Sequence, residues 1–250
     1  MKTPSSENPL SSILHRRPAA KAFTLMETVI AIGVLAVLLT GFIAVFTPAA
    51  QGIRRSISAQ QADRLTTTLE RELVTLRKDQ EAATIKTGFD KAFDWIDKAN
   101  NATDAIFVYQ YRGDPSSIRA DGTPTPQDKV AGQPGIGYTI QSIARRASEP
   151  EFADDLLAIE GAIFYVKPTQ LIYSGNEMVL GTIGSIANKA GEIPPNPTNA
   201  AAYMDAVIAF SAEFFSVPSK SSSYLTGPDF GTRFNTATRP VFSRNLAVRR

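Results

Sequence analysis

The feature that most constrains this chain is an apolar run near its N-terminus. No residue from Thr28 to Ile53 carries a charge, and the 18 residues from Val29 to Phe46 are interrupted only by Gly33, Thr40 and Gly41. At 1.5 Å per residue, a helix of this length nearly spans a hydrocarbon core of about 30 Å. A buried core helix rarely stays apolar on all sides for so long. The run therefore predicts a membrane helix over about residues 28–47.

Charges on the two sides of the run are nearly balanced, since Arg16, Arg17 and Lys21 precede it and Arg54 and Arg55 follow it. A short basic segment before a first apolar run usually stays in the cytoplasm. We therefore expect a cytoplasmic N-terminus and export of everything that follows the membrane helix.

A cleaved secretory signal peptide is the main alternative for this segment. Residues 47–50 include small residues near the right place for cleavage. However, the apolar run is longer than the 7–15 residues or so of a signal-peptide core, and Glu27 lies where that core should begin. Both features favour an anchor that is kept.

Glu27 needs a reason, because a carboxylate near the bilayer centre costs on the order of 2.5–3.5 kcal/mol and less at the interface. Three explanations are open from the residues alone. Glu27 lies at headgroup depth, or its charge suits the N-terminal end of the helix dipole, or it pairs with a cation from another chain.

The residues from Lys21 to Glu27, KAFTLME, followed by an apolar helix, resemble the class III signal of type IV prepilins and type II secretion pseudopilins. The resemblance covers about residues 16–55. It implies that prepilin peptidase cuts between Ala22 and Phe23 and methylates the new amine of Phe23. The residue before the cut is normally Gly in that family, and here it is Ala22. The resemblance also implies that Glu27 pairs with the terminal ammonium of a neighbouring subunit, which attracts it strongly in a desolvated helical core.

The same resemblance implies a domain organisation and a function. Residues 1–22 are then a leader, residues 23–78 a long N-terminal helix, and residues 79–250 an exported α+β domain of pilin-like fold. The expected product is a structural subunit, by its size a minor pseudopilin, of a pilus-like or type II secretion filament. Its partners are prepilin peptidase, other pilin or pseudopilin subunits, an inner-membrane assembly platform and the lipid bilayer. The chain would be a single-pass inner-membrane protein with a periplasmic or extracellular C-terminal domain.

Small and kinking residues of the membrane helix are assigned to assembly. Gly33 and Gly41 permit close helix approach, and Pro48 predicts a kink or loosening. The alternative is a membrane-anchored exported enzyme or binding protein that does not polymerise.

Beyond the membrane the periodicity changes twice. An amphipathic helix is predicted to about residue 78, with its apolar face formed by Ile57, Leu65, Leu69, Leu73 and Leu76. A short helix is expected at 91–98, and strands at 106–112, 137–143, 162–167, 170–173 and 178–183. Residues 113–135 and 188–199 are expected to be loops. Residues 202–217 fit a helix or a strand, and residues 240–250 a short strand or a tail. One long helix followed by short strands predicts an α+β fold with an antiparallel sheet on that helix.

Catalysis and cofactors are not expected. The chain has no cysteine, its single histidine is His15, and its net charge of +2 gives no basis for nucleic-acid binding. Scattered acids could contribute to a calcium site, but they lack EF-hand spacing and are better explained as surface residues: Asp104, Asp121, Asp128, Asp154 and Asp155. A DNA-binding pilin would need an exposed basic stripe, whereas Arg145–Arg146 and Arg249–Arg250 are only pairs, which a solvated surface explains equally well. The 21 Tyr and Phe residues are expected to be mainly core.

Overall fold

The computed structural model describes residues 24–127, 137–175 and 177–250. The chain divides into two compact units, one ending at Gln51 and one running from Gly52 to Arg250. Three residues singled out from the sequence, Ala22, Phe23 and Asp128, lie outside the described residues.

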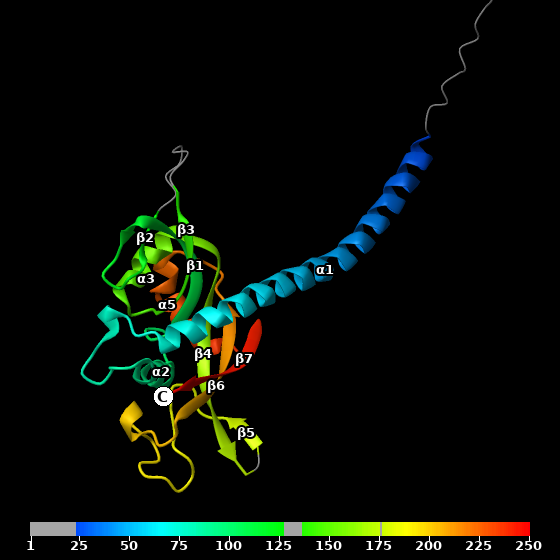
Figure 1. Ribbon diagram of the computed structural model, residues 1–250. Coiled ribbons are helices and arrows are strands. Elements are labelled where there is room, and N and C mark those ends of the chain that lie inside the picture. Colours follow the sequence, from blue (N-terminus) through cyan, green and yellow to red (C-terminus); the bar gives the residue numbers. More distant parts are fainter. Residues whose placement is uncertain (1–23, 128–136, 176) are drawn as a thin grey trace, which may run out of the picture. The chain divides into compact units, whose positions relative to one another are not determined.

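A single helix, α1, runs from Leu25 to Val74 and is the longest element of the protein (Figure 1). It continues past Pro48, so the proline does not end the helix, and the expected kink stays a prediction. The helix ends four residues before the predicted boundary at 78, and a turn of 3-10 helix follows at Lys78–Gln80. We call residues 25–51 the apolar half of α1 and residues 52–74 its docked half.

The docked half buries the predicted face, with Leu65, Leu69 and Leu73 at most 5% exposed. Ile57, which the periodicity placed on the same face, is 49% exposed, and that part of the prediction was wrong. The physical reason is that the hydrophobic core of this unit begins at Ala62, so a helix turn before that residue has nothing to pack against.

The rest of the unit is a seven-stranded antiparallel sheet with the order β2-β1-β4-β6-β7, in which β3 also pairs with β1 and β5 with β4. The strands are β1 (Ile106–Ile118), β2 (Pro124–Pro126), β3 (Thr139–Arg146), β4 (Ile159–Ser174), β5 (Glu177–Leu180), β6 (Val207–Ser216) and β7 (Phe242–Arg249). The helices after α1 are α2 (Gly88–Asp97), α3 (Pro150–Asp155), α4 (Ser222–Leu225) and α5 (Pro228–Thr236), with short 3-10 turns at Leu156–Ala158 and Ala200–Ala202. The α+β class is therefore confirmed.

The helix expected at 91–98 and the strands expected at 137–143 and 178–183 are present as α2, β3 and β5, with ends shifted by a few residues. Two larger differences concern β1 and β4. The loop expected to begin at 113 is still strand to Ile118, because the chain turns back at Gly122 and pairs with β2. Positive φ at that glycine, +80°, permits the turn. The two strands expected at 162–167 and 170–173 are one strand, β4, in which Pro168 lies opposite Ala212 of β6. The undecided segment 202–217 contains strand β6, and the C-terminal segment contains β7.

Both faces of the sheet are covered. Alternate residues of β1 point to opposite sides, so Ile106 and Val108 meet the docked half of α1 and α2, whereas Phe107 and Tyr109 meet α3 and α5. Only the first of these layers was predicted from the sequence. The second layer contains stacked aromatic rings, and the centroids of Phe107 and Phe152 lie 4.6 Å apart. Most aromatic residues of the sheet are therefore core, as expected.

Candidate functional site

The apolar half of α1 exposes apolar side chains on all of its sides. Its large side chains are more than half exposed, from Leu25 at 84% to Phe46 at 59%, and the helix is long and apolar enough to span a membrane. The hydroxyls of Thr40 and Thr47 donate to carbonyls four residues earlier, at 2.8 and 2.9 Å. These bonds satisfy the polar groups within the helix, which is the condition for a stable backbone in lipid.

Glu27 lies in the first turn of α1 and is exposed. The residue before the helix, Thr24, caps it, since its hydroxyl accepts a hydrogen bond from the backbone N–H of Glu27 at 3.2 Å. A carboxylate in the first turn is stabilised by the positive end of the helix dipole. This favours one of the three explanations for Glu27 and is compatible with the pairing that the resemblance implies.

Gly33 and Gly41 leave open surface along the apolar half, because a Cβ at either position would meet nothing within 4 Å. A second helix could therefore approach the backbone closely at both glycines. Close packing there stays a prediction, as do processing at Ala22 and methylation at Phe23, which lie outside the described residues.

A buried ion cluster closes the end of the docked half. Glu72 is 1% exposed and accepts hydrogen bonds from Arg77 at 2.7 Å and from Lys91 at 3.1 Å. Burial alone would raise the pKa of Glu72, but the hydrogen bond from Arg77 and the charges of Arg77 and Lys91 lower it below the ordinary value. The cluster fastens α1 to the next turn and to α2.

A second buried cluster surrounds Arg145 of β3, whose side chain is fully buried. Arg145 pairs with Asp121 and with Asp155, and Tyr109 donates to Asp155 at 2.7 Å. The prediction that Arg145, Asp121 and Asp155 are solvated surface residues was wrong. Sequence reasoning missed them because their partners come from separate elements, and single acids and bases carry no sign of long-range pairing. Arg119 completes the cluster at 2.8 Å from Asp155.

The remaining acids considered for calcium are spread out. Asp154 is exposed and Asp104 half-buried. Within residues 24–127, 137–175 and 177–250, no three His, Cys, Asp or Glu side chains come together to hold a metal ion.

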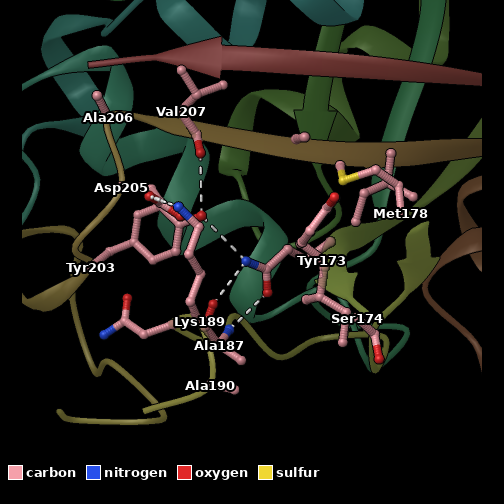
Figure 2. A pocket seen from close by; sticks show the side chains of 15 residues that line it. Tyr173, Ser174, Met178, Ala187, Lys189, Ala190, Tyr203, Asp205, Ala206 and Val207 are labelled. Carbon is pink, nitrogen blue, oxygen red and sulfur yellow. Dashed lines mark hydrogen bonds and ion pairs between the residues drawn. The ribbon is translucent and has the colours of Figure 1, made fainter. Parts of the chain in front are cut away.

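A pocket of about 540 Å³ opens where β4 and β6 separate (Figure 2). Their pairing ends at Gln170 and Phe210, although β4 continues to Ser174 and β6 begins at Val207. The loop before β6 fills part of the gap, and Tyr203 on that loop donates to the carbonyl of Val207 at 3.2 Å.

The polar groups of this pocket largely satisfy one another. Gln170 donates to the carbonyl of Ala187 at 2.9 Å and accepts from its N–H at 2.8 Å, and Lys189 pairs with Asp205 at 2.7 Å. The open wall is apolar, with Tyr173 57% exposed and Met178 52% exposed. A ligand here would be held mainly by apolar contact. The sequence carried no signal for this pocket, since its lining comes from three strands, β4, β5 and β6, and two loop segments.

No protein-family model matches the chain, and comparisons with curated proteins and with solved structures found no significant similarity.

Proposed function

We propose that the protein is a membrane-anchored structural subunit of a type IV pilus-like or type II secretion filament, of the minor pseudopilin kind. The observation that carries the proposal is the sequence KAFTLME immediately before an apolar helix. Prepilin peptidase would release the chain at Phe23, and the apolar half of α1 would hold it in the inner membrane until assembly.

The architecture supports the proposal in a general way. A long helix has an apolar half with exposed side chains, and its docked half packs on an antiparallel sheet. Such a helix has a use beyond anchoring, because neighbouring apolar halves can replace lipid contacts with helix–helix contacts in a filament. The covering of the sheet on both faces leaves α1 as the large apolar surface offered to other subunits.

The test is the intact mass and N-terminal residue of the chain, produced with and without a prepilin peptidase. We expect a peptidase-dependent start at N-methyl-Phe23. A matched variant, Phe23→Asp, should stop processing while leaving the folded unit intact. A start near Ala50 would instead indicate a secretory signal peptide and would overturn the proposal.

Assembly is tested separately with Glu27→Ala in cells that produce the other filament subunits. We expect loss of the variant from sheared filaments, with normal processing and membrane fractionation. Glu70, on the docked half, provides a control because Glu70→Gln removes a carboxylate from the same helix without touching the apolar half. Normal incorporation of the Glu27 variant would count against a filament role.

One observation favours a second candidate, a membrane-anchored binding protein that does not polymerise. The pocket between β4 and β6 falls within the 300–1,000 Å³ or so that small-molecule sites occupy. In that case a Met178→Trp substitution, which fills the open wall, would abolish function in cells, while Glu27→Ala would have no effect.

A further inference from the structure

Positive charge gathers at one corner of the exported unit, where the end of β6 meets the end of α5. A pocket of about 320 Å³ lies there, lined by residues 215–216, 233 and 236–239. Two arginines, Arg233 and Arg239, belong to this lining, and no carboxylate does. The pocket is separate from the one between β4 and β6.

Arg233 is only partly used by the protein itself. One of its terminal nitrogens donates to the carbonyl of Ser216 at 3.0 Å, which ties α5 to the end of β6. Its Nε is buried and has no hydrogen-bond partner in the described part of the chain. An arginine presents its donors as a planar fork, and the other terminal nitrogen of Arg233 forms no hydrogen bond within the described residues, so it is suited to a planar or tetrahedral oxyanion in the pocket that this side chain lines.

Lys167 of β4 adds a third cation behind the pocket. It is 6% exposed, donates to the carbonyl of Ala237 at 3.1 Å, and lies 5.1 Å from the ring centre of Phe215. Glu213 stands opposite it on β6, yet no ion pair within 4 Å forms between them. A buried lysine is normally paired with a carboxylate, and burial lowers the pKa of Lys167.

Arg239 completes the arrangement from the solvent side. It is exposed and forms no ion pair with any carboxylate of residues 24–127, 137–175 and 177–250. Two arginines therefore line one pocket and Lys167 lies behind its wall, and none of the three forms an ion pair with a carboxylate of the described residues. The field of such a group concentrates anions, and more strongly where apolar walls such as Phe215 limit solvent screening.

We propose that this pocket binds an oxyanion, of the phosphate, sulfate or carboxylate class. Arg239 and the free terminal nitrogen of Arg233 would hold the anion, and Lys167 would strengthen the field behind it. The volume exceeds that of a bare phosphate, which leaves room for an attached group. The site does not depend on filament assembly, so it would stand or fall independently of the proposed function.

The experiment is arginine footprinting of the full chain in detergent micelles. Phenylglyoxal modifies exposed guanidinium groups, and peptide mass spectrometry reports the rate at each arginine. We expect 20 mM phosphate to slow modification of Arg239 at least threefold relative to chloride of equal ionic strength. Arg249 is an internal control, since it is exposed on β7 away from the pocket lining, and its rate should not change.

Two further arms identify the anion. Acetate in place of phosphate tests a carboxylate, and nanodiscs with or without phosphatidylglycerol test whether a lipid headgroup supplies the phosphate. Protection in any one of these arms supports the site and assigns its source. Equal protection by chloride, or equal protection of Arg249, would overturn the proposal.

A variant provides a readout that does not rely on arginine chemistry. Trp95 is the only tryptophan and is 1% exposed, so its fluorescence follows unfolding of the exported unit. Phosphate should raise the unfolding midpoint over chloride, and Arg239→Gln should remove at least half of that rise. Arg249→Gln should leave it intact. A rise of the same size in both variants would contradict the proposal.

Discussion

The two halves of α1 are continuous in sequence and have opposite surroundings. In the apolar half, Leu38 is 65% exposed, as are its neighbours on all sides of the helix to a similar degree. In the docked half, Leu69 is completely buried and the opposite face carries charge. The same residue type is therefore part of the hydrophobic core in one half and, in the other, part of an exposed apolar surface long enough to span a membrane. What decides between them is the pattern of the neighbours, since apolar residues all round indicate a membrane and a single apolar stripe indicates a sheet.

The carboxylates of the two halves show the same contrast. Glu27 is exposed in the first turn of α1, where its charge interacts favourably with the positive end of the helix dipole. Glu72 is buried at the other end of α1 and is held by two cations. A charge that the fold needs is thus enclosed with its partners, whereas Glu27 is left available to a partner outside the chain.

The largest expected effect is at Glu72. Replacing it by Gln removes the carboxylate that pairs with both Arg77 and Lys91, and breaking a buried pair in this way typically costs about 3–5 kcal/mol. We expect the free energy of unfolding of the unit from Gly52 to Arg250 to fall by that amount, measured by urea titration of the full chain in micelles with Trp95 fluorescence. The half-buried Glu70 is the control, and Glu70→Gln should change the value by less than about 0.5 kcal/mol.

If Glu72→Gln were as stable as the wild type, the ion cluster would make no net contribution to the stability of the fold. A buried pair can indeed be energetically neutral against an apolar replacement of similar size. A third variant, Glu72→Met with Lys91→Met, separates these cases, since it removes both charges of the fully buried pair and leaves only Arg77, whose side chain is 14% exposed; it should recover part of the loss.

The second effect compares one leucine from each half. Leu69→Ala should destabilise the unit from Gly52 to Arg250 by about 2–5 kcal/mol, because the cavity it leaves lies between α1 and the sheet. Leu38→Ala should leave the same unfolding transition within about 0.5 kcal/mol, because Leu38 is not part of the hydrophobic core of that unit. Equal losses in the two variants would mean that the two halves of α1 are energetically coupled.

Features that depend on residues close together in the sequence could be predicted from it. The apolar run, the stripe of Leu65, Leu69 and Leu73, and the aromatic strand at 106–112 were all predicted, because each is repeated over several turns or residues. Ile57 fits the stripe equally well and is exposed. Periodicity shows which way a side chain points, and only the tertiary structure shows whether anything lies there.

Features formed by residues far apart in the sequence could not be predicted from it. Arg145 meets Asp121 and Asp155 through a turn and a helix that no local pattern announces. The pockets at the β4–β6 separation and at the end of α5 likewise depend on strand pairing. At the predicted site, the cap formed by Thr24 was the one local contact that could have been found, since a threonine three residues before a glutamate is a known helix start.

The smallest expected effect is the change of stability with pH, which should differ between the apolar half of α1 and the folded unit that follows it. No residue of the apolar half after Glu27 has an ionisable side chain. Its helix content in micelles should therefore be the same at pH 2 and pH 7, measured by hydrogen exchange of its amides relative to their intrinsic rate at each pH. The unit from Gly52 to Arg250 holds Asp121, where burial alone would raise the pKa but hydrogen bonds from Arg145 and Thr123 lower it from 3.8 to about 2. A carboxyl group with a lowered pKa in the folded state stabilises the fold above its unfolded pKa. We therefore expect stability to be lost as the pH falls from about 3.8 to 2.

Glu149 should show a pH dependence of stability with the opposite sign, because burial raises its pKa above 4.5 in spite of nearby cations. A raised pKa means that the folded state prefers the protonated acid, so its contribution is complete below 4.5 and declines as the pH rises through the raised value. Glu149→Gln, which keeps an oxygen to accept from Gln80, should therefore be slightly more stable than the wild type at pH 7 and equal to it at pH 4. A variant that is less stable at pH 7 would show that the attraction of Arg145 outweighs the cost of burying Glu149.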